Sequence, residues 1–148
     1  MSAQAPTVLV VEDNPTDVLL IRRAFARAKI GNPLQILQDG DAAVDYLAGE
    51  GAYADRGAFP LPAVMLLDLK LPRRSGLEVL EWVRARAPLR RLPVVVLTSS
   101  NQMQDVNRAY DLGANSYLVK PVEFADLEGM LARVHIYWVD VNMKPTFA

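Results

Sequence analysis

Five short apolar runs alternate along the chain with longer segments of helical periodicity. The runs are rich in β-branched residues and only a few residues long, which is typical of buried strands in a parallel sheet. They occupy residues 7–11, 34–37, 63–67, 92–97 and 116–119. This alternation predicts an α/β domain in which right-handed crossovers place helices on both faces of a doubly wound, five-stranded parallel sheet.

Helices are predicted between and after these strands, with caps supplied by the residue types. Asn14 can cap the first helix, Pro15 suits its first position, and an apolar stripe at 3-4-3 spacing runs from Val18 to Ala28. We expect the stretch 49–62, with three glycines and two prolines, to be a surface loop. The other predicted helices are 41–47, closed by Gly49; one capped by Ser75; 101–112, closed by Gly113; and one beginning near Glu123.

The last helix continues its apolar pattern well past the fifth strand. Residues from Phe124 to Val141 keep 3-4-3-4-3 spacing, and one helix over residues 123–142 would be about 30 Å long. Its aromatic part, 136–139, is more than one subunit can bury, and large exposed aromatic patches are uncommon on monomers. We therefore expect a homodimer through the fourth helix, fifth strand, fifth helix and the C-terminal extension at about 135–148; the alternative is an ordinary amphipathic terminal helix.

Length and charge bound the class of protein. The 148 residues suit a single domain spanning 1–148, and 51% hydrophobic residues supply its core. A net charge of −1 argues against nucleic-acid binding through bulk positive charge. No apolar run approaches the ~20 residues of a membrane span, and the start, residues 1–6, lacks the pattern of a signal peptide. Together with the absence of cysteine, this predicts a cytoplasmic protein.

The cysteine and histidine counts restrict the chemistry further. With no cysteine, the chain has no disulfide, zinc–thiolate site, iron–sulfur cluster or thiol nucleophile. A single histidine, His135, excludes a histidine-based metal cage. It lies late in the last helix, far from the strand ends, so we expect it at an interface or surface and not as a phosphorelay histidine. Any metal must be a hard ion held by oxygen, which favours magnesium or calcium.

Polar residues follow four of the predicted strands at the points where they end. Glu12 and Asp13 follow the first strand, Asp68 the third, Thr98 the fourth and Lys120 the fifth. The carboxyl ends of parallel strands line one ligand-binding edge of the sheet. Three carboxylates there repel one another unless a cation sits among them, and magnesium suits such a site. Helix caps, first-turn acids and a solvated lysine would explain each residue alone, but their joint occurrence favours one site that binds an oxyanion such as a phosphoryl group.

These strand ends lie in four motifs: Val-Val-Glu-Asp-Asn (10–14), Leu-Leu-Asp-Leu-Lys-Leu-Pro (66–72) with Gly76 after it, Leu-Thr-Ser-Ser (97–100) and Tyr-Leu-Val-Lys-Pro (117–121). Together the four motifs resemble the receiver domain of two-component response regulators. The resemblance covers residues 7 to about 134. It implies a flavodoxin-like five-stranded receiver architecture and a signalling protein that accepts a phosphoryl group from a phosphohistidine on a sensor histidine kinase.

The same resemblance implies roles for individual residues around a magnesium ion. Asp68 is the phosphoacceptor. Asp13 and Asp68 are direct Mg²⁺ ligands, the backbone carbonyl of Lys70 is a third, and Glu12 assists through water.

Three further residues bind the phosphoryl group or respond to it. Lys120 pairs with the phosphoryl oxygens, the Thr98 hydroxyl bonds to them once the group is attached, and Tyr117 occupies the aromatic switch position. The Lys120–Pro121 peptide is expected to be cis, as it is in the family. Such a protein catalyses only its own phosphotransfer and dephosphorylation.

A narrower resemblance concerns the kinase partner. The receiver, its Asp-Leu-Lys-Leu-Pro-Arg-Arg-Ser-Gly turn (68–76), the 49–62 insertion and the Tyr-Trp tail resemble the small regulators that partner bacterial phytochrome kinases. A chemotaxis-type regulator is a poorer match because its last helix is shorter.

Other functions remain open at this point. The protein could be a phosphate sink or a relay intermediate. An aspartyl-phosphate phosphatase or phosphomutase could use Asp68 as nucleophile, although the 49–62 insertion is short for a cap. A nucleotide- or flavin-binding protein of similar fold would need a glycine-rich loop after the first strand, where this chain has Glu-Asp-Asn-Pro.

Overall fold

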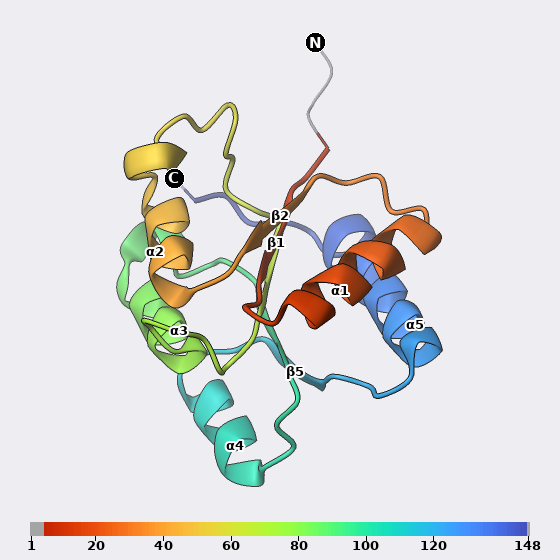
Figure 1. The fold of residues 1–148 in the computed structure, drawn as a ribbon. Helices are drawn as coiled ribbons and strands as arrows, with labels where there is room; N and C mark the ends of the chain where they lie inside the picture. The colour runs from red at the N-terminus through yellow and green to blue at the C-terminus, as the bar shows by residue number, and fades with distance from the viewer. Residues whose placement is uncertain (1–4, 148) are drawn as a thin grey trace.

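The computed structural model describes residues 5–147 and contains a five-stranded parallel sheet (Figure 1). The strand order is β2-β1-β3-β4-β5, so the expected doubly wound sheet is confirmed. β1, β3 and β4 are buried on both faces, which is why their sequences are apolar without alternation. The expectation for the first residues, 1–4, lies outside the described part of the chain. The strands are β1 (Val8–Val11), β2 (Leu34–Leu37), β3 (Val64–Leu67), β4 (Val94–Thr98) and β5 (Ser116–Val119).

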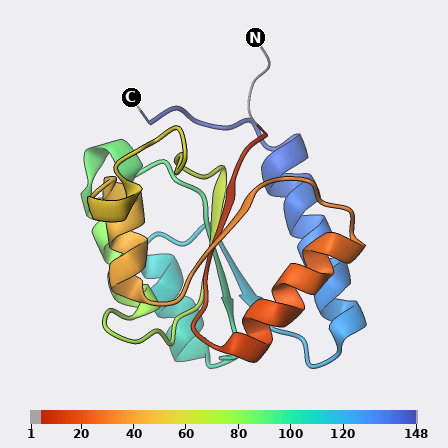
Figure 2. The same cartoon turned by 45° about the horizontal axis from the view of Figure 1, so that its top comes forward.

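Two layers of helices cover the sheet. α1 and α5 pack on one face, and α2, α3 and α4 pack on the other (Figure 2). In the described part of the chain, no helix combines the length and the apolar character that crossing a bilayer requires. The helices are α1 (Pro15–Arg27), α2 (Gly40–Ala48), α3 (Gly76–Ala85), α4 (Met103–Asp111) and α5 (Phe124–His135), with short helical segments η1 (Gly51–Tyr53), η2 (Ala87–Leu89) and η3 (Ile136–Val141).

The helix ends follow the expected capping chemistry. Asn14 Oδ1 accepts hydrogen bonds from two backbone N–H groups of the first turn of α1, and Ser75 forms a reciprocal capping box with Glu78. Gly49 closes α2 in the left-handed conformation at φ 71°. β4 begins two residues later than expected because its first predicted residue, Leu92, is still held in the preceding turn.

The last helix departs from regular α-helical winding after His135. The following turns are wider and π-helical, and Asn142 N donates to Tyr137 O, five residues back, at 2.6 Å. Because the wider winding changes which residues face the core, Val139 is buried whereas Val141 is 66% exposed. The prediction of one uniform apolar stripe through Val141 is therefore wrong.

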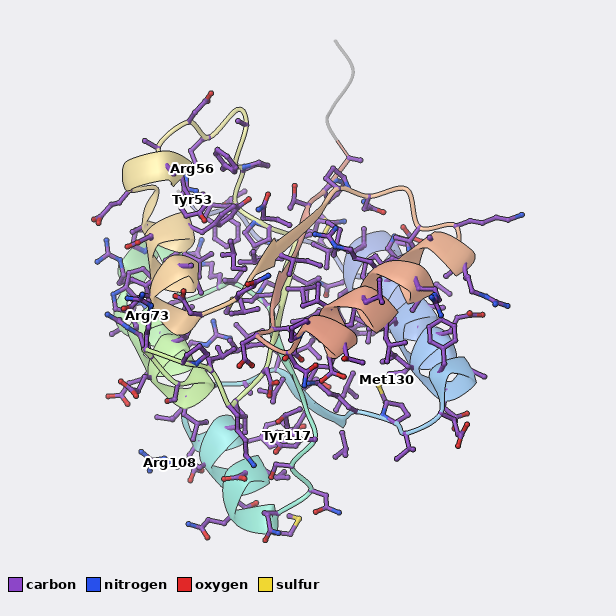
Figure 3. The ribbon with its side chains drawn as sticks, in the orientation of Figure 1. Tyr53, Arg56, Arg73, Arg108, Tyr117 and Met130 are labelled. Carbon is purple, nitrogen blue, oxygen red and sulfur yellow. The ribbon has the colours of Figure 1, made fainter. Side chains whose placement is uncertain are left out.

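The stretch 49–62 is ordered by aromatic packing and one arginine. The rings of Tyr46, Tyr53 and Phe59 form a cluster with centroids 5.2–6.1 Å apart. The Arg56 guanidinium donates to three backbone carbonyls, two of them in the last turn of α2 (Figure 3). The expected surface loop thus also satisfies carbonyls at the C-terminal end of α2.

Two glycines let the loop after β3 lie against the helices beside it. A Cβ at Gly76, the first residue of α3, would lie 2.1 Å from Asp68 O. A Cβ at Gly40, the first residue of α2, would lie 1.9 Å from Arg74 O. Both contacts are with backbone, which cannot move aside as a flexible side chain would. The absence of a side chain at Gly40 and Gly76 therefore fixes the path of the chain just after Asp68.

Replacing Gly76 by alanine should destabilise the protein, whereas the same change at Gly129 should stabilise it. The added methyl group at Gly76 overlaps backbone, and overpacking of this kind costs about 3 kcal/mol. At Gly129, inside α5, an added Cβ would have only the end of the flexible Arg133 side chain nearby, at 3.9 Å, so Gly129→Ala should gain about 0.5–1 kcal/mol of helix stability. Urea unfolding of both variants tests this; equal shifts in the same direction would contradict the close approach at Gly76.

Candidate functional site

The ends of β1 and β3 bring three carboxylates together. Val11 and Leu67 are paired neighbours in the sheet, so the residues after them leave the same edge side by side. Carboxylate oxygens of Glu12, Asp13 and Asp68 lie within 4.8 Å of one another. The structure thus places these three predicted residues in one cluster.

Lys120 enters the same cluster from the end of β5. Its Nζ donates to Asp68 Oδ2 at 3.0 Å, to Asp17 Oδ2 at 2.9 Å and to Glu12 Oε1. The Lys120 side chain is only 13% exposed, so it is a buried cation among carboxylates. The backbone also fixes its position, because Lys120 N donates to Thr98 O at 2.7 Å.

Asp17 is a member of the site that sequence reasoning missed. It lies in the first turn of α1, three residues after the cap Asn14, and does not follow a strand. A first-turn acid is ordinarily explained by the helix dipole alone. The available signal was that α1 starts at the carboxyl edge of β1, so its first turn faces the residues that end the other strands.

Burial and charge set the ionisation of these groups. Burial raises the pKa of Glu12 to about 7, and the negative charge of Asp68 adds to this effect, although Lys120 opposes it. Burial also pushes the pKa of Asp68 upward, but hydrogen bonds from Lys120 and Thr98 and the charge of Lys120 outweigh it, so this pKa stays below its ordinary value. Burial would lower the pKa of Lys120, and its three carboxylate partners raise it above the usual lysine value.

The donor set of the cluster fits a hard divalent cation. It consists of carboxylate oxygens, with Asp13 exposed to solvent and Glu12 and Asp68 buried. One lysine does not balance the acids gathered around it, and an added divalent cation would reduce their mutual repulsion. Lys70, which comes two residues after Asp68, is also at the site, with its backbone N 3.4 Å from Asp68 Oδ1.

Thr98 and Tyr117 both contact the loop between β4 and α4. Thr98 ends β4 and is fully buried, and its Oγ1 accepts from Ser100 N at 3.5 Å. The Tyr117 hydroxyl donates to Ser100 O at 3.0 Å, so the β5 ring is tied to the loop that Thr98 begins. Figure 3 shows Tyr117 near α4. Thr98 O accepts from Lys120 N, so Thr98 lies beside the cluster, whereas the Tyr117 hydroxyl is bonded to the loop that follows Thr98.

The expected cis bond at Lys120–Pro121 is not found. All peptide bonds in the described residues are trans. The trans form of an X–Pro bond is favoured by about 0.5–1 kcal/mol, and with a trans bond Lys120 reaches its three carboxylate partners.

His135 makes an intramolecular contact instead of lying free at the surface. Its Nε2 lies 2.6 Å from Asn32 Oδ1, and the Asn32 side-chain N–H group donates to Pro6 O at 2.9 Å. This half-buried histidine joins the end of α5 to the loop before β2. The expected surface position is wrong, because the His135 side chain is only 15% exposed and neither Asn32 nor Pro6 could be inferred as a neighbour from its place in the helix. An interface position for His135 stays a prediction.

Known proteins resemble this chain over most of its length. The response regulator receiver domain model matches residues 8–132. The probable methanogenesis regulatory protein FilR2 of Methanothrix harundinacea is 42% identical over 138 residues, which is 93% of this chain and 86% of FilR2. The response regulator Rcp1 of Synechocystis is 37% identical over 138 residues, which is 93% of this chain and 92% of Rcp1.

Solved structures agree with the sequence relatives. The phosphorylated cyanobacterial phytochrome response regulator RcpA superposes with a TM-score of 0.89 at 33% identity, over 97% of this chain and 100% of RcpA. The Mn²⁺-bound form of Rcp1 superposes with a TM-score of 0.84 at 36% identity, over 95% of this chain and 99% of Rcp1, so a relative binds a divalent metal. This chain belongs to the family of response regulator receiver domains.

Proposed function

We propose that this protein is a cytoplasmic, single-receiver response regulator that accepts a phosphoryl group on Asp68 from a sensor histidine kinase in a Mg²⁺-dependent reaction. The observation that carries this proposal is the Lys120 ammonium 3.0 Å from Asp68 Oδ2, inside a cluster of carboxylates that fits a divalent cation. A cation beside a carboxylate nucleophile can stabilise the charge of a phosphoryl group in transfer.

The chemistry requires Asp68 to be ionised and held in line with the donor. Its lowered pKa keeps it ionised at neutral pH. One of its oxygens forms a bond to phosphorus while the phosphorus–nitrogen bond of the donor phosphohistidine breaks, and the electron pair of that bond returns to the imidazole. Lys120 then faces the phosphoryl oxygens, and the rigid strand ends supply the positioning on which such transfers depend.

The metal would be held by residues adjoining the phosphoacceptor. Asp13 and Asp68 would be direct ligands, with the Lys70 backbone carbonyl as a third and Glu12 acting through a water molecule. Bound Mg²⁺ would supply charge neutralisation on the transferring group. The exposed position of Asp13 and the oxygen-only donor set support this assignment.

Signalling would start at Thr98. Its hydroxyl would bond to the new phosphoryl oxygens and move inward, taking with it the loop to which Ser100 belongs. The Tyr117 hydroxyl is bonded to Ser100 O, so the ring could not keep its present contact unchanged. A local charge event would thus bias a two-state surface formed by α4, β5 and α5.

Replacing Asp68 by asparagine should abolish phosphorylation. The amide has no carboxylate nucleophile, so labelling by acetyl phosphate with Mg²⁺ should fall to background, and chelation of Mg²⁺ should have the same effect on the unmodified protein. Mass spectrometry measures the added phosphoryl group. Asp111→Asn, the same change on exposed α4, is the control and should label normally. Stoichiometric labelling of Asp68→Asn would reject the assignment.

A phytochrome-type kinase is the phosphoryl donor that we propose. The support is the likeness to RcpA, a phytochrome response regulator, over nearly the whole of both chains.

Phosphotransfer profiling against the histidine kinases of the host should find one kinetically preferred donor of the phytochrome type. Transfer rates from each purified, autophosphorylated kinase are measured with Asp68→Asn as the blank. A clear preference for a kinase without a light-sensing domain would contradict this choice of partner.

We also propose a homodimer through α4, β5, α5 and the C-terminal extension. Two features support it. Ile136, Tyr137 and Val141 are exposed apolar residues on the extension. A groove of about 530 Å³ runs along edge strand β5 and α5, and Leu118 and Trp138 are among its lining residues.

A charge in this region should separate the dimer. Tyr137→Asp places a carboxylate in the apolar face, so light scattering should report a monomer where the unmodified protein is a dimer. Leu19→Asp, an exposed apolar position on α1, is the matched control and should remain dimeric. A mass of one chain for the unmodified protein, both phosphorylated and not, would rule out the dimer.

A further inference from the structure

The ammonium group of Lys120 has no free donor. A lysine carries three N–H groups, and here Glu12, Asp17 and Asp68 accept one each. If Lys120 is to bind a phosphoryl group, a phosphoryl oxygen must displace one of these three carboxylates. Which of them yields is therefore a question about the reaction itself.

Glu12 and Asp68 are poor candidates for release. Glu12 is 2% exposed, and its second oxygen already accepts from Asn14 N at 3.1 Å, so release from Lys120 would leave a buried carboxylate without a directly bonded cation. Asp68 is the residue that would receive the phosphoryl group, and it stays beside Lys120 by position. Loss of the hydrogen bond to Lys120 would therefore be unfavourable for both Glu12 and Asp68.

Asp17 differs from both in exposure and in origin. Its side chain is 33% exposed, so water can replace Lys120 as its hydrogen-bond partner. It lies on the first turn of α1, outside the strand ends that hold the other two carboxylates. A cavity of about 30 Å³ lies between Asp17 and Lys120, and its remaining lining residues, such as Leu20 and Leu127, are apolar. This cavity therefore offers the Lys120 ammonium no hydrogen-bond acceptor in place of Asp17.

We propose that Asp17 is a positioning residue for phosphoryl transfer, an inference that rests on the proposed function of Asp68. In the unphosphorylated protein Asp17 holds the third N–H of Lys120. When a phosphoryl group arrives, one of its oxygens takes that N–H, and Asp17 turns to solvent. Asp17 is thus the exchangeable partner that keeps Lys120 in place and is released when the group binds.

Asp17→Asn should bind a phosphoryl analogue more tightly than the unmodified protein. The probe is fluoroberyllate with saturating Mg²⁺, titrated by calorimetry against the full chain. Loss of a partly exposed ion pair that competes with the analogue should raise its affinity about fivefold. With acetyl phosphate, the KM should fall by a similar factor while kcat changes little, because the nucleophile and its metal ligands are untouched.

Two further variants separate exchange from a general charge effect. Asp126→Asn removes the exposed first-turn acid of neighbouring α5 and should leave fluoroberyllate affinity unchanged. Asp17→Glu keeps a carboxylate within reach of Lys120 and should restore the affinity of the unmodified protein. Urea unfolding of each variant checks that the fold is intact.

The outcomes distinguish the proposed role of Asp17 from the proposed phosphorylation of Asp68. Unmodified protein that binds fluoroberyllate, with Asp17→Asn binding it equally or more weakly, overturns the exchange and leaves the proposed function standing. An equal gain in Asp126→Asn also overturns it, because the gain would then reflect net charge alone. Unmodified protein that neither binds fluoroberyllate nor labels with acetyl phosphate overturns the proposed function, and the role of Asp17 with it.

Discussion

One buried ammonium surrounded by carboxylates is the interaction on which this site depends. Taking Glu12 and Asp68 out of water is costly, and their like charges add to the cost. Lys120 offsets both effects, and the opposite pKa shifts of the two acids arise from how they share it: Asp68 stays readily ionised, whereas the pKa of Glu12 is held near neutrality at about 7. The same arrangement leaves an excess of negative charge that suits a divalent cation, and it gives the site a buried ammonium group of its own.

The fold holds this cluster through backbone more than through side chains. The pairing of β1 with β3 and of β4 with β5 brings each strand end to a fixed place at the edge, and the hydrogen bond from Lys120 N to Thr98 O continues the last of these ladders into the site. On the other side of Asp68, glycines 40 and 76 allow α2 and α3 to touch the loop backbone directly. The strand pairing and these close backbone contacts therefore keep the carboxylates near one another despite their repulsion.

The sequence could predict that the strands run parallel and where each one ends. It could not predict which side chains make contact between a helix and a strand end. Strand ends of a parallel sheet meet whatever their separation along the chain, so the gathering of Asp13, Asp68 and Lys120 could be expected. The contact of Asp17 with Lys120 depends on the axis of α1 and the reach of a long side chain, which no spacing encodes. The widening after His135 is similar, because the apolar spacing of residues 136–141 does not show where regular α-helical winding ends.

The position of the site at the edge of the sheet explains how a small change could reach the surface. β5 is the outermost strand, and it carries both Lys120 at its end and Tyr117 within it. The Tyr117 hydroxyl is bonded to the same loop that Thr98 begins, so a displacement of that loop acts on an edge strand directly. β5 itself forms one wall of the groove beside α5, with Ser116 and Leu118 among the lining residues. In the proposed mechanism, a phosphoryl group on Asp68 would act on an exposed face through the Thr98 hydroxyl, the loop after it and the Tyr117 ring. Because a packed core resists gradual deformation, we expect the response to be a change between two discrete arrangements.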